Sequence, residues 1–124
     1  MAGKRPIFTQ NFSANILAIQ AFLGSEGHKP FQRFLDRLFD EIIPQLCRFP
    51  KSGRSFLAHT IHSSEAKSLA TQLRTRLNRD DDLREFIVDE YLVLYLLRSH
   101  HLIFLSVKHH RQLSFDLKRF WQET

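Results

Sequence analysis

The spacing of apolar residues changes halfway along the chain, and this change constrains the fold more than any other feature. The first half carries two apolar stripes with the period of an α-helix. The first stripe consists of Phe12, Ile16, Ile19 and Leu23. The second runs through residues 31–46, with Pro44 in its last turn, and Gly24 and Gly27 separate the two stripes. Two amphipathic helices joined by a short turn predict an antiparallel helical hairpin.

The second half consists of three shorter runs at 83–88, 91–97 and 102–107, rich in leucine, aromatic and β-branched residues. Polar residues separate the runs, so they predict an antiparallel meander of three strands. The middle run is apolar almost throughout, which is typical of a central strand covered on both faces. The third run alternates, and one of its faces is expected to become polar toward the end.

Four other segments complete the expected fold. Residues 6–9 form either an edge strand or the lead into the first helix, and residues 50–54 form a turn by their Pro and Gly content. Residues 64–77 predict an extra helix before the meander, and residues 114–121 predict a short C-terminal helix. The expected fold class is α+β: a single domain over residues 1–124, with the helical hairpin packed on a small antiparallel sheet.

The composition indicates a soluble protein, and its positive charge favours an anionic partner such as nucleic acid or an acidic protein; the alternative is a solvated surface with no such partner. Eighteen Lys and Arg residues against thirteen Asp and Glu residues give a formal charge of +5, and the pI is about 9.8. Cys47 is the single cysteine, which excludes an intrachain disulfide and indicates a reducing compartment, the cytoplasm. No stretch reaches the roughly 18 apolar residues of a membrane-spanning helix, so we expect no membrane insertion.

Four of the seven histidines lie around one hairpin and the exit of the third run, together with Arg98, Lys108 and Arg111. Such a group fits phosphate binding. An imidazole there also fits proton transfer during cleavage of an RNA backbone, because histidine titrates near neutral pH. The alternative for His100 and His101 is a solvated hairpin tip.

His109 and His110 are expected on opposite faces of the extended chain. His110 then shares a face with Ser106 and Lys108. His109 lies on the face of Val107, where a hydrogen-bonded core histidine is the ordinary outcome. Either histidine is a candidate for a catalytic or binding role.

Arg54, Arg84 and Arg98 are each suited to hold a phosphate or a partner's carboxylate through two hydrogen bonds. The alternative is a surface charge or a structural ion pair. Arg84, which lies beside Glu85 and near Asp89, fits that alternative.

Other chemistries lack the residues they need. His59 and His62 are spaced as zinc ligands can be, but one cysteine cannot complete the usual Cys/His set, so we expect no metal. Cys47 lies in an apolar helical stretch and no serine sits in a Gly-framed turn, which argues against a nucleophilic enzyme. The four glycines do not match a phosphate-cradling loop, and we expect no cofactor.

The order of elements and two motifs resemble the RelE/ParE superfamily of bacterial toxins. One motif is the strand pair with LRE at 83–85, Tyr91 and LY at 94–95, and the other is VKHHRQ at 107–112. A turn with Pro50, Gly53 and Arg54 after the helical hairpin is a further point of resemblance. The likeness covers roughly two thirds of the chain and does not account for the segment 64–77.

The resemblance implies the toxin component of a type II toxin–antitoxin system, which inhibits growth and is neutralised by a cognate antitoxin. Members of the superfamily either cleave mRNA on the ribosome or inhibit DNA gyrase, and the resemblance leaves both targets open. Glu85 and Phe86 stand where several of the nucleases carry paired arginines, and the LRE motif is closer to the gyrase inhibitors. The positive charge and the histidines, in contrast, suit RNA phosphates.

Position in these motifs suggests two sets of site residues. The catalytic candidates are His109, His110, Arg111 and Tyr95. The candidates for binding nucleic acid or the target are Arg54, Arg84, Arg98 and Lys108. The alternative function is a non-toxic nucleic-acid or protein adaptor, and the oligomeric state stays open.

Overall fold

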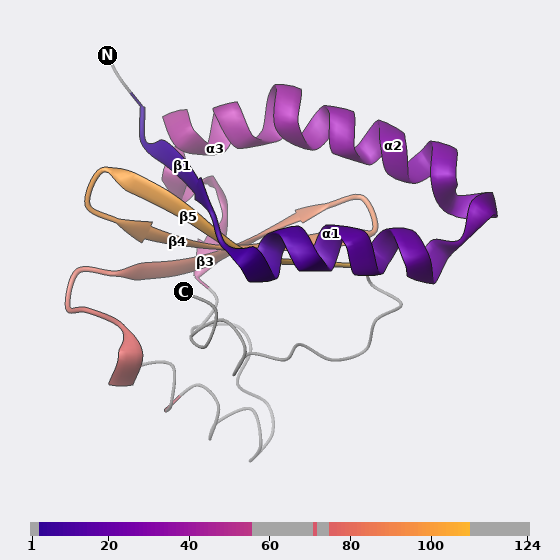
Figure 1. The fold of residues 1–124 in the computed structure, drawn as a ribbon. Coiled ribbons are helices and arrows are strands. Elements are labelled where there is room, and N and C mark those ends of the chain that lie inside the picture. Colours follow the sequence, from indigo (N-terminus) through magenta and orange to yellow (C-terminus); the bar gives the residue numbers. More distant parts are fainter. Residues whose placement is uncertain (1–2, 56–70, 72–74, 110–124) are drawn as a thin grey trace.

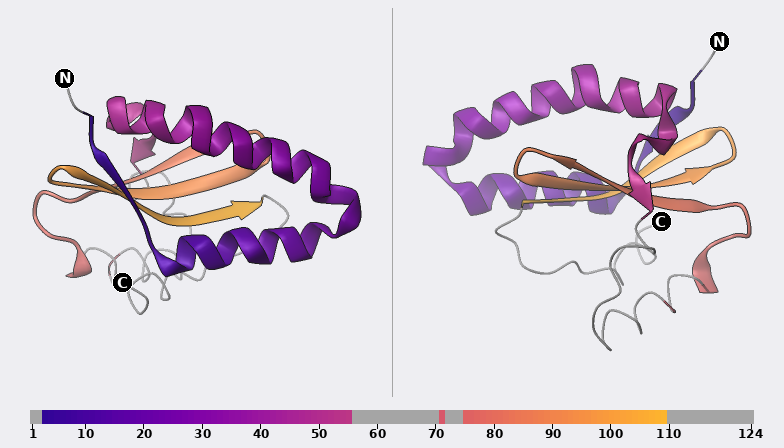
Figure 2. Two further views of the ribbon diagram at one scale, coloured as in Figure 1. Left: turned by 45° about the horizontal axis from the view of Figure 1, so that its top comes forward. Right: turned by 180° about the vertical axis from the view of Figure 1, so that it is seen from behind.

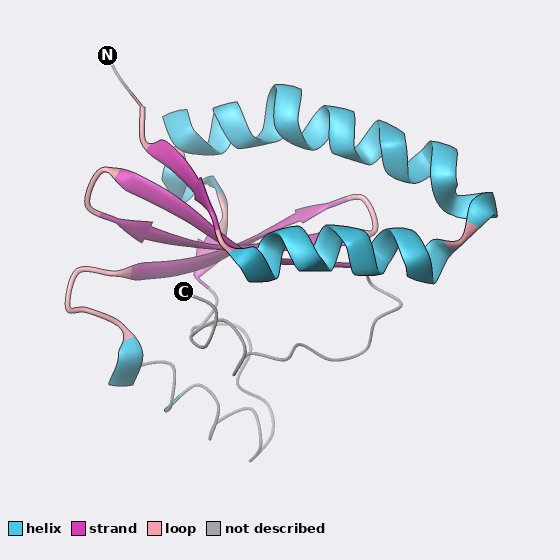
Figure 3. Cartoon of the chain, in the orientation of Figure 1, coloured by secondary structure: helices cyan, strands magenta, loops and turns pink. Residues whose placement is uncertain are grey.

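The computed structural model describes residues 3–55, 71 and 75–109, in which one strand and two long helical stretches precede four further strands (Figures 1 and 3). The helices are α1 (Gln10–Leu23), α2 (His28–Arg37) and α3 (Ile43–Arg48), and the strands are β1 (Arg5–Phe8), β2 (Arg54–Ser55), β3 (Asp82–Val88), β4 (Tyr91–Arg98) and β5 (His101–His109). The fold is α+β, as the sequence predicts.

The described strands form one sheet in the order β1-β5-β4-β3-β2. The predicted meander is confirmed, since β3, β4 and β5 are successive antiparallel neighbours and β4 is the central strand. The sheet as a whole is mixed, however, because β1 pairs with β5 in parallel. The expectation of a wholly antiparallel sheet was therefore wrong at this edge, where residues 5–8 carry no local signal for the direction of their partner.

Helix α1 follows its predicted stripe. The hydroxyl of Thr9 caps the helix by accepting a hydrogen bond from the backbone N–H of Phe12 at 3.1 Å. Gly24, with φ of 68°, ends it in a left-handed conformation that costs glycine little. Phe12 and Ile19 are buried beneath the helix, which confirms the face that the periodicity selects.

The second helical stretch is continuous from α2 to α3 but widens into a π-helical segment over Leu38–Ile42. The segment comes directly before Pro44, which has no N–H and whose ring would collide with the carbonyl of Asp40 in a regular α-helix. A π-helical turn relieves such a collision. The proline in the last turn of this stretch is therefore accommodated by a local change of helical pitch.

Both helical stretches pack on the same face of the sheet, as the two views in Figure 2 show. Between them and the strands lies a core rich in aromatic rings. Its most deeply buried members are Phe12, Ile19, Leu38, Leu46, Val93, Tyr95, Leu102, Phe104 and Val107. On the central strand β4, Leu94 and Leu96 are buried as well, on the opposite face, which confirms a strand covered on both sides.

Strand β5 does not keep the simple alternation that its sequence suggests. Leu94 pairs with Ser106 and Tyr95 with Phe104, so Leu105 is an extra residue in a β-bulge. After the bulge, Val107 returns to the helix-facing side. The prediction of strict alternation was wrong at this point: Ser106 and Lys108 lie on the face of Leu94, not on the face of Phe104.

Helix α1 covers the edge of β5 where β1 has ended. The side-chain amide of Asn11 donates to the carbonyl of Leu105 at 2.9 Å. The carbonyl oxygen of the Asn15 side chain accepts from the Ser106 hydroxyl at 2.8 Å and from the Val107 N–H at 3.2 Å. These polar side chains replace a neighbouring strand, which fixes the bulge and protects the open edge.

The extra helix expected at 64–77 lies mostly outside the described residues, and the helix expected at 114–121 lies wholly outside them. Within the described ranges, no helix has the length and apolar character needed to cross a membrane.

Candidate functional site

The predicted site residues that the structure describes occupy three separate places. Arg54, Arg84 and Tyr95 lie near the turn between α3 and β2. Arg98 lies at the β4–β5 turn, and Lys108 and His109 lie at the far end of β5. His110 and Arg111 are outside the described residues. The described candidates therefore do not converge on one reaction centre.

Tyr95 is fully buried and fixes the turn that leads to β2. Its hydroxyl donates to the carbonyl of Pro50 at 2.7 Å and accepts from the N–H of Gly53 at 3.0 Å. Burial raises the pKa of Tyr95 above its ordinary value, so the phenol stays neutral. Both hydrogen-bonding directions are used inside the protein, which makes Tyr95 a structural residue of this turn.

Gly53 is required at this turn because a larger side chain would not fit. A Cβ on Gly53 would lie 2.5 Å from the Tyr95 hydroxyl and 2.6 Å from the carbonyl oxygen of Glu85. The second of these atoms is backbone and cannot move aside easily. The Pro50-to-Gly53 turn and the LY motif thus depend on each other physically.

Arg84 braces the same turn from β3. Its Nε pairs with Asp82 at 2.8 Å, and its Nη1 donates to the carbonyl oxygens of Lys51 and Gly53. Arg84 thus forms a structural ion pair, which was one of the two interpretations of the sequence, but its partner is Asp82 and not the neighbouring Glu85 or Asp89. Residues two apart on a strand share a face, so Asp82 is on the face of Arg84 and Glu85 is on the other.

Arg54 forms a cross-strand pair with Glu85, with Nε 2.7 Å from Oε1. The Glu85 side chain is only 5% exposed, whereas that of Arg54 is 53% exposed. The arginine supplies the positive charge that a buried carboxylate needs. Its role is therefore at least partly structural, although half of its surface stays open to solvent.

Arg98 holds Asp81 through two hydrogen bonds, of 2.9 Å from Nε and 2.6 Å from Nη2. The Asp81 side chain is 2% exposed, and the hydrogen bond from Arg98 lowers the pKa of this carboxyl. Sequence reasoning missed Asp81, since it falls in a run of three aspartates that reads as a polar connection. Only the strand register shows which of the three meets Arg98.

His109 lies on the face of Val107, as predicted, and is 2% exposed. Its Nε2 is 3.1 Å from the Glu90 carboxylate, and its ring stands edge-on to Tyr91 with centroids 5.0 Å apart. Lys108 faces the other way, opposite Leu92, and is half-buried. A substrate phosphate could not reach the buried His109 ring without displacing its neighbours.

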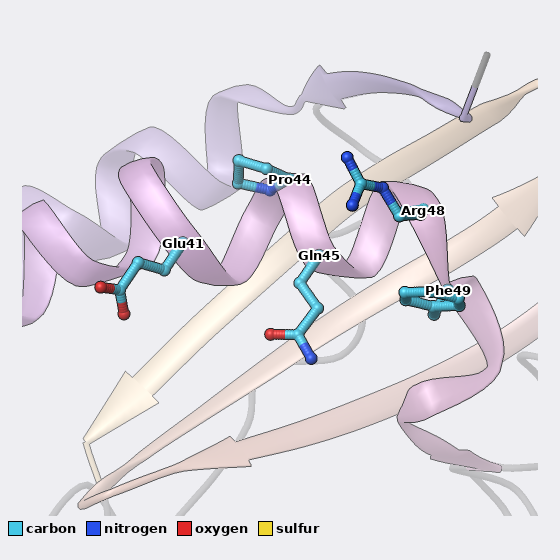
Figure 4. Close-up of a pocket in the computed structure, with 5 residues that line it drawn as sticks. All are labelled: Glu41, Pro44, Gln45, Arg48 and Phe49. Carbon is cyan, nitrogen blue, oxygen red and sulfur yellow. The ribbon is translucent and has the colours of Figure 1, made fainter. Parts of the chain in front are cut away.

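Two shallow cavities lie on the helical side, and sequence reasoning predicted neither. One, of about 280 Å³, has Phe34, Arg37, Glu90 and Tyr91 in its walls. The other, of about 380 Å³, runs along α3; Figure 4 shows its lining residues, which are Glu41, Pro44, Gln45, Arg48 and Phe49. Neither cavity contains a predicted site residue.

The described part of the chain contains no group of three His, Cys, Asp or Glu side chains placed to hold a metal ion. His59 and His62 lie outside it. In comparisons with known proteins, no family model and no curated protein sequence matches this chain.

Proposed function

We propose that this chain is the toxin of a bacterial type II toxin–antitoxin system, of the RelE/ParE kind, which acts in the cytoplasm and is neutralised by a cognate antitoxin. The observation that carries the proposal is the contact between the separate pieces of the resemblance. Tyr95 of the LY motif hydrogen-bonds to Pro50 and Gly53, and Arg84 of the LRE motif holds the same turn. A chance likeness between short sequence motifs would not require their residues to be in contact.

Of the two targets, inhibition of DNA gyrase is the one that the described residues favour. Tyr95 and His109 are buried and hydrogen-bonded within the fold, so neither offers a reacting group at the surface. A toxin that acts by binding needs no such group. Cleavage of mRNA on the ribosome is the second target, and it would depend on His110 and Arg111.

The test is to express the chain from an inducible promoter, alone and together with the gene encoded beside it. We expect growth arrest with the chain alone and recovery with its neighbour. Growth that is unaffected in both cultures would reject the toxin and leave a non-toxic adaptor.

The same cultures, together with purified protein, distinguish DNA gyrase from ribosome-bound mRNA as the target. Loss of gyrase supercoiling activity, with intact transcripts in the arrested cells, is the expected result. New transcript ends within codons, lost in the H110Q/R111Q double variant, would instead identify ribosome-dependent cleavage.

A further inference from the structure

The start of β1 and the end of α3 lie near the β4–β5 turn, at one end of the sheet (Figure 1). The Lys4 amine donates to the carbonyl of Ser99 at 2.8 Å, and the backbone N–H of Arg5 donates to the carbonyl of His100 at 2.8 Å. The N–H of Lys4 also donates to the carbonyl of Cys47 at 2.8 Å, which brings the neighbouring Arg48 to the same place. We name this surface, formed by Lys4, Arg5, Arg48, His100 and His101, the basic end.

The strand register sets several of these side chains in a row. Arg5 of β1 is the register partner of His101 on β5, and His101 is the partner of Arg98 on β4. Register partners in neighbouring strands share a face of the sheet and lie about 5 Å apart. Three basic side chains therefore stand next to one another across three strands.

Within this row, Arg98 is paired with Asp81, whereas Arg5 is exposed and forms no ion pair with any described residue. Arg48, which lies beside the row at the end of α3, is likewise exposed and forms no ion pair with any described residue. The guanidinium of Arg5 is therefore open to an anionic ligand, and Arg48 adds a second exposed cation at the same end.

The two turns of the sheet differ in charge. The β3–β4 turn consists of Asp89 and Glu90, and Asp89 pairs with Arg37 at 3.0 Å. The β4–β5 turn, in contrast, lies beside Lys4 and Arg5. Exposed positive charge of this kind attracts a polyanion.

We propose that the basic end binds the phosphate backbone of a nucleic acid. Arginine is the side chain best suited to phosphate, because its guanidinium can donate two parallel hydrogen bonds to the phosphate oxygens. The basic end offers two exposed arginines, Arg5 and Arg48, to a ligand whose charges repeat. Contacts of this kind position a nucleic acid without reading its sequence. The inference goes beyond the proposed function, because it holds whether or not the chain is toxic, and it lies away from His109 and the VKHHRQ motif.

The experiment compares two double variants with the same net charge. R5Q/R48Q removes two cations from the basic end, and R33Q with K29Q removes two exposed cations from α2 at the other end. Binding to labelled RNA and DNA oligonucleotides of about 20 nucleotides, single-stranded and duplex, is followed by fluorescence anisotropy between about 50 and 200 mM KCl.

We expect R5Q/R48Q to weaken binding about tenfold or more and to lower the salt slope by nearly two, whereas the α2 variant stays within about twofold of the parent. Which oligonucleotide binds most tightly then identifies RNA or DNA. Equal losses in the two variants would reduce the effect to net charge and overturn the proposal. Tighter binding of poly-glutamate at the basic end would overturn the proposal in favour of an acidic protein.

If the R5Q/R48Q variant does not fold, R48Q alone replaces it, because Arg48 makes no strand pair. About a threefold loss of binding is then expected.

Discussion

The two turns that bracket β4 have similar backbones and opposite chemistry. Asp89 begins the β3–β4 turn and Ser99 begins the β4–β5 turn, and both have φ of 53°. At the first turn, the side chains bind inward: Asp89 pairs with Arg37 on α2, and Glu90 contacts His109 on β5. The acidic turn therefore ties a helix and the last strand together.

At the second turn, the backbone accepts the contacts. The carbonyl oxygen of Ser99 accepts from the Lys4 amine, and that of His100 accepts from the backbone N–H of Arg5. Arg5 itself is exposed to solvent. The two turns thus share a positive φ at their first residue but differ in which atoms make the contacts: side chains at the β3–β4 turn and backbone carbonyls at the β4–β5 turn. Substitutions that change stability can test this difference.

The largest effect is expected between the two ends, at the turn that Tyr95 holds. G53A would force a Cβ against the Tyr95 hydroxyl and the Glu85 carbonyl, and should cost about 3 kcal/mol of the free energy of unfolding. Y95F should cost about 1.5 kcal/mol, since it leaves the Gly53 N–H and the Pro50 carbonyl without their partner. Urea unfolding measures both.

A double-mutant cycle checks the cause. G53A/Y95F should be less destabilised than the sum of the single variants, because phenylalanine removes one of the two colliding atoms. Additive losses would show that the hydroxyl and Gly53 do not depend on each other.

The sequence predicts the parts of this fold that depend on neighbours along the chain, and misses those that depend on distant ones. The stripes of α1 and α2 and the three strands of the meander follow from local periodicity. The parallel pairing of β1, the bulge at Leu105 and the partner of Arg98 each depend on contacts between residues far apart in sequence. The same limit applies to the basic end, since Arg5 and His101 meet only through the sheet register.

The next largest effect is expected at the ion pair of Arg98 and Asp81, beside the basic end. D81N keeps the shape of the buried side chain but removes the charge that Arg98 binds, and should cost about 2 kcal/mol. At the acidic turn, R37Q should cost about 0.5 kcal/mol, since both members of the Arg37–Asp89 pair are exposed. Equal losses in the two variants would contradict the difference in burial on which this ranking depends.

The pH dependence sharpens the same contrast. Arg98 lowers the pKa of Asp81 in the folded protein, so this carboxyl stabilises the fold fully above its unfolded pKa of about 3.9. The contribution is lost as the pH falls through the lower, folded value. We expect the urea midpoint of D81N to fall less than that of the parent between about pH 5 and pH 2. Parallel curves would exclude Asp81 as a source of acid sensitivity.

A smaller effect is expected where Glu90 meets the buried His109. E90Q keeps an oxygen and an amide within reach of the imidazole, and should change stability by about 0.5 kcal/mol or less. E90A removes the contact and should cost about 1 kcal/mol. If both variants have the stability of the parent, this hydrogen bond does not stabilise the contact between the acidic turn and β5.

The smallest effects come from the turns themselves, and their signs should differ. Glycine adopts a positive φ without strain, so S99G should raise stability by about 0.5 kcal/mol after its entropy in the unfolded chain is included. D89G gains less, because aspartate tolerates this conformation better than serine, and it also loses the pair with Arg37, so it should lower stability by about 0.5 kcal/mol. The carbonyl of Ser99 that binds Lys4 is retained in S99G, so nucleic-acid binding at the basic end should not change. Shifts of the same sign and size in the two variants would mean that backbone strain alone governs both turns and that the side chain of Asp89 contributes nothing to the acidic end.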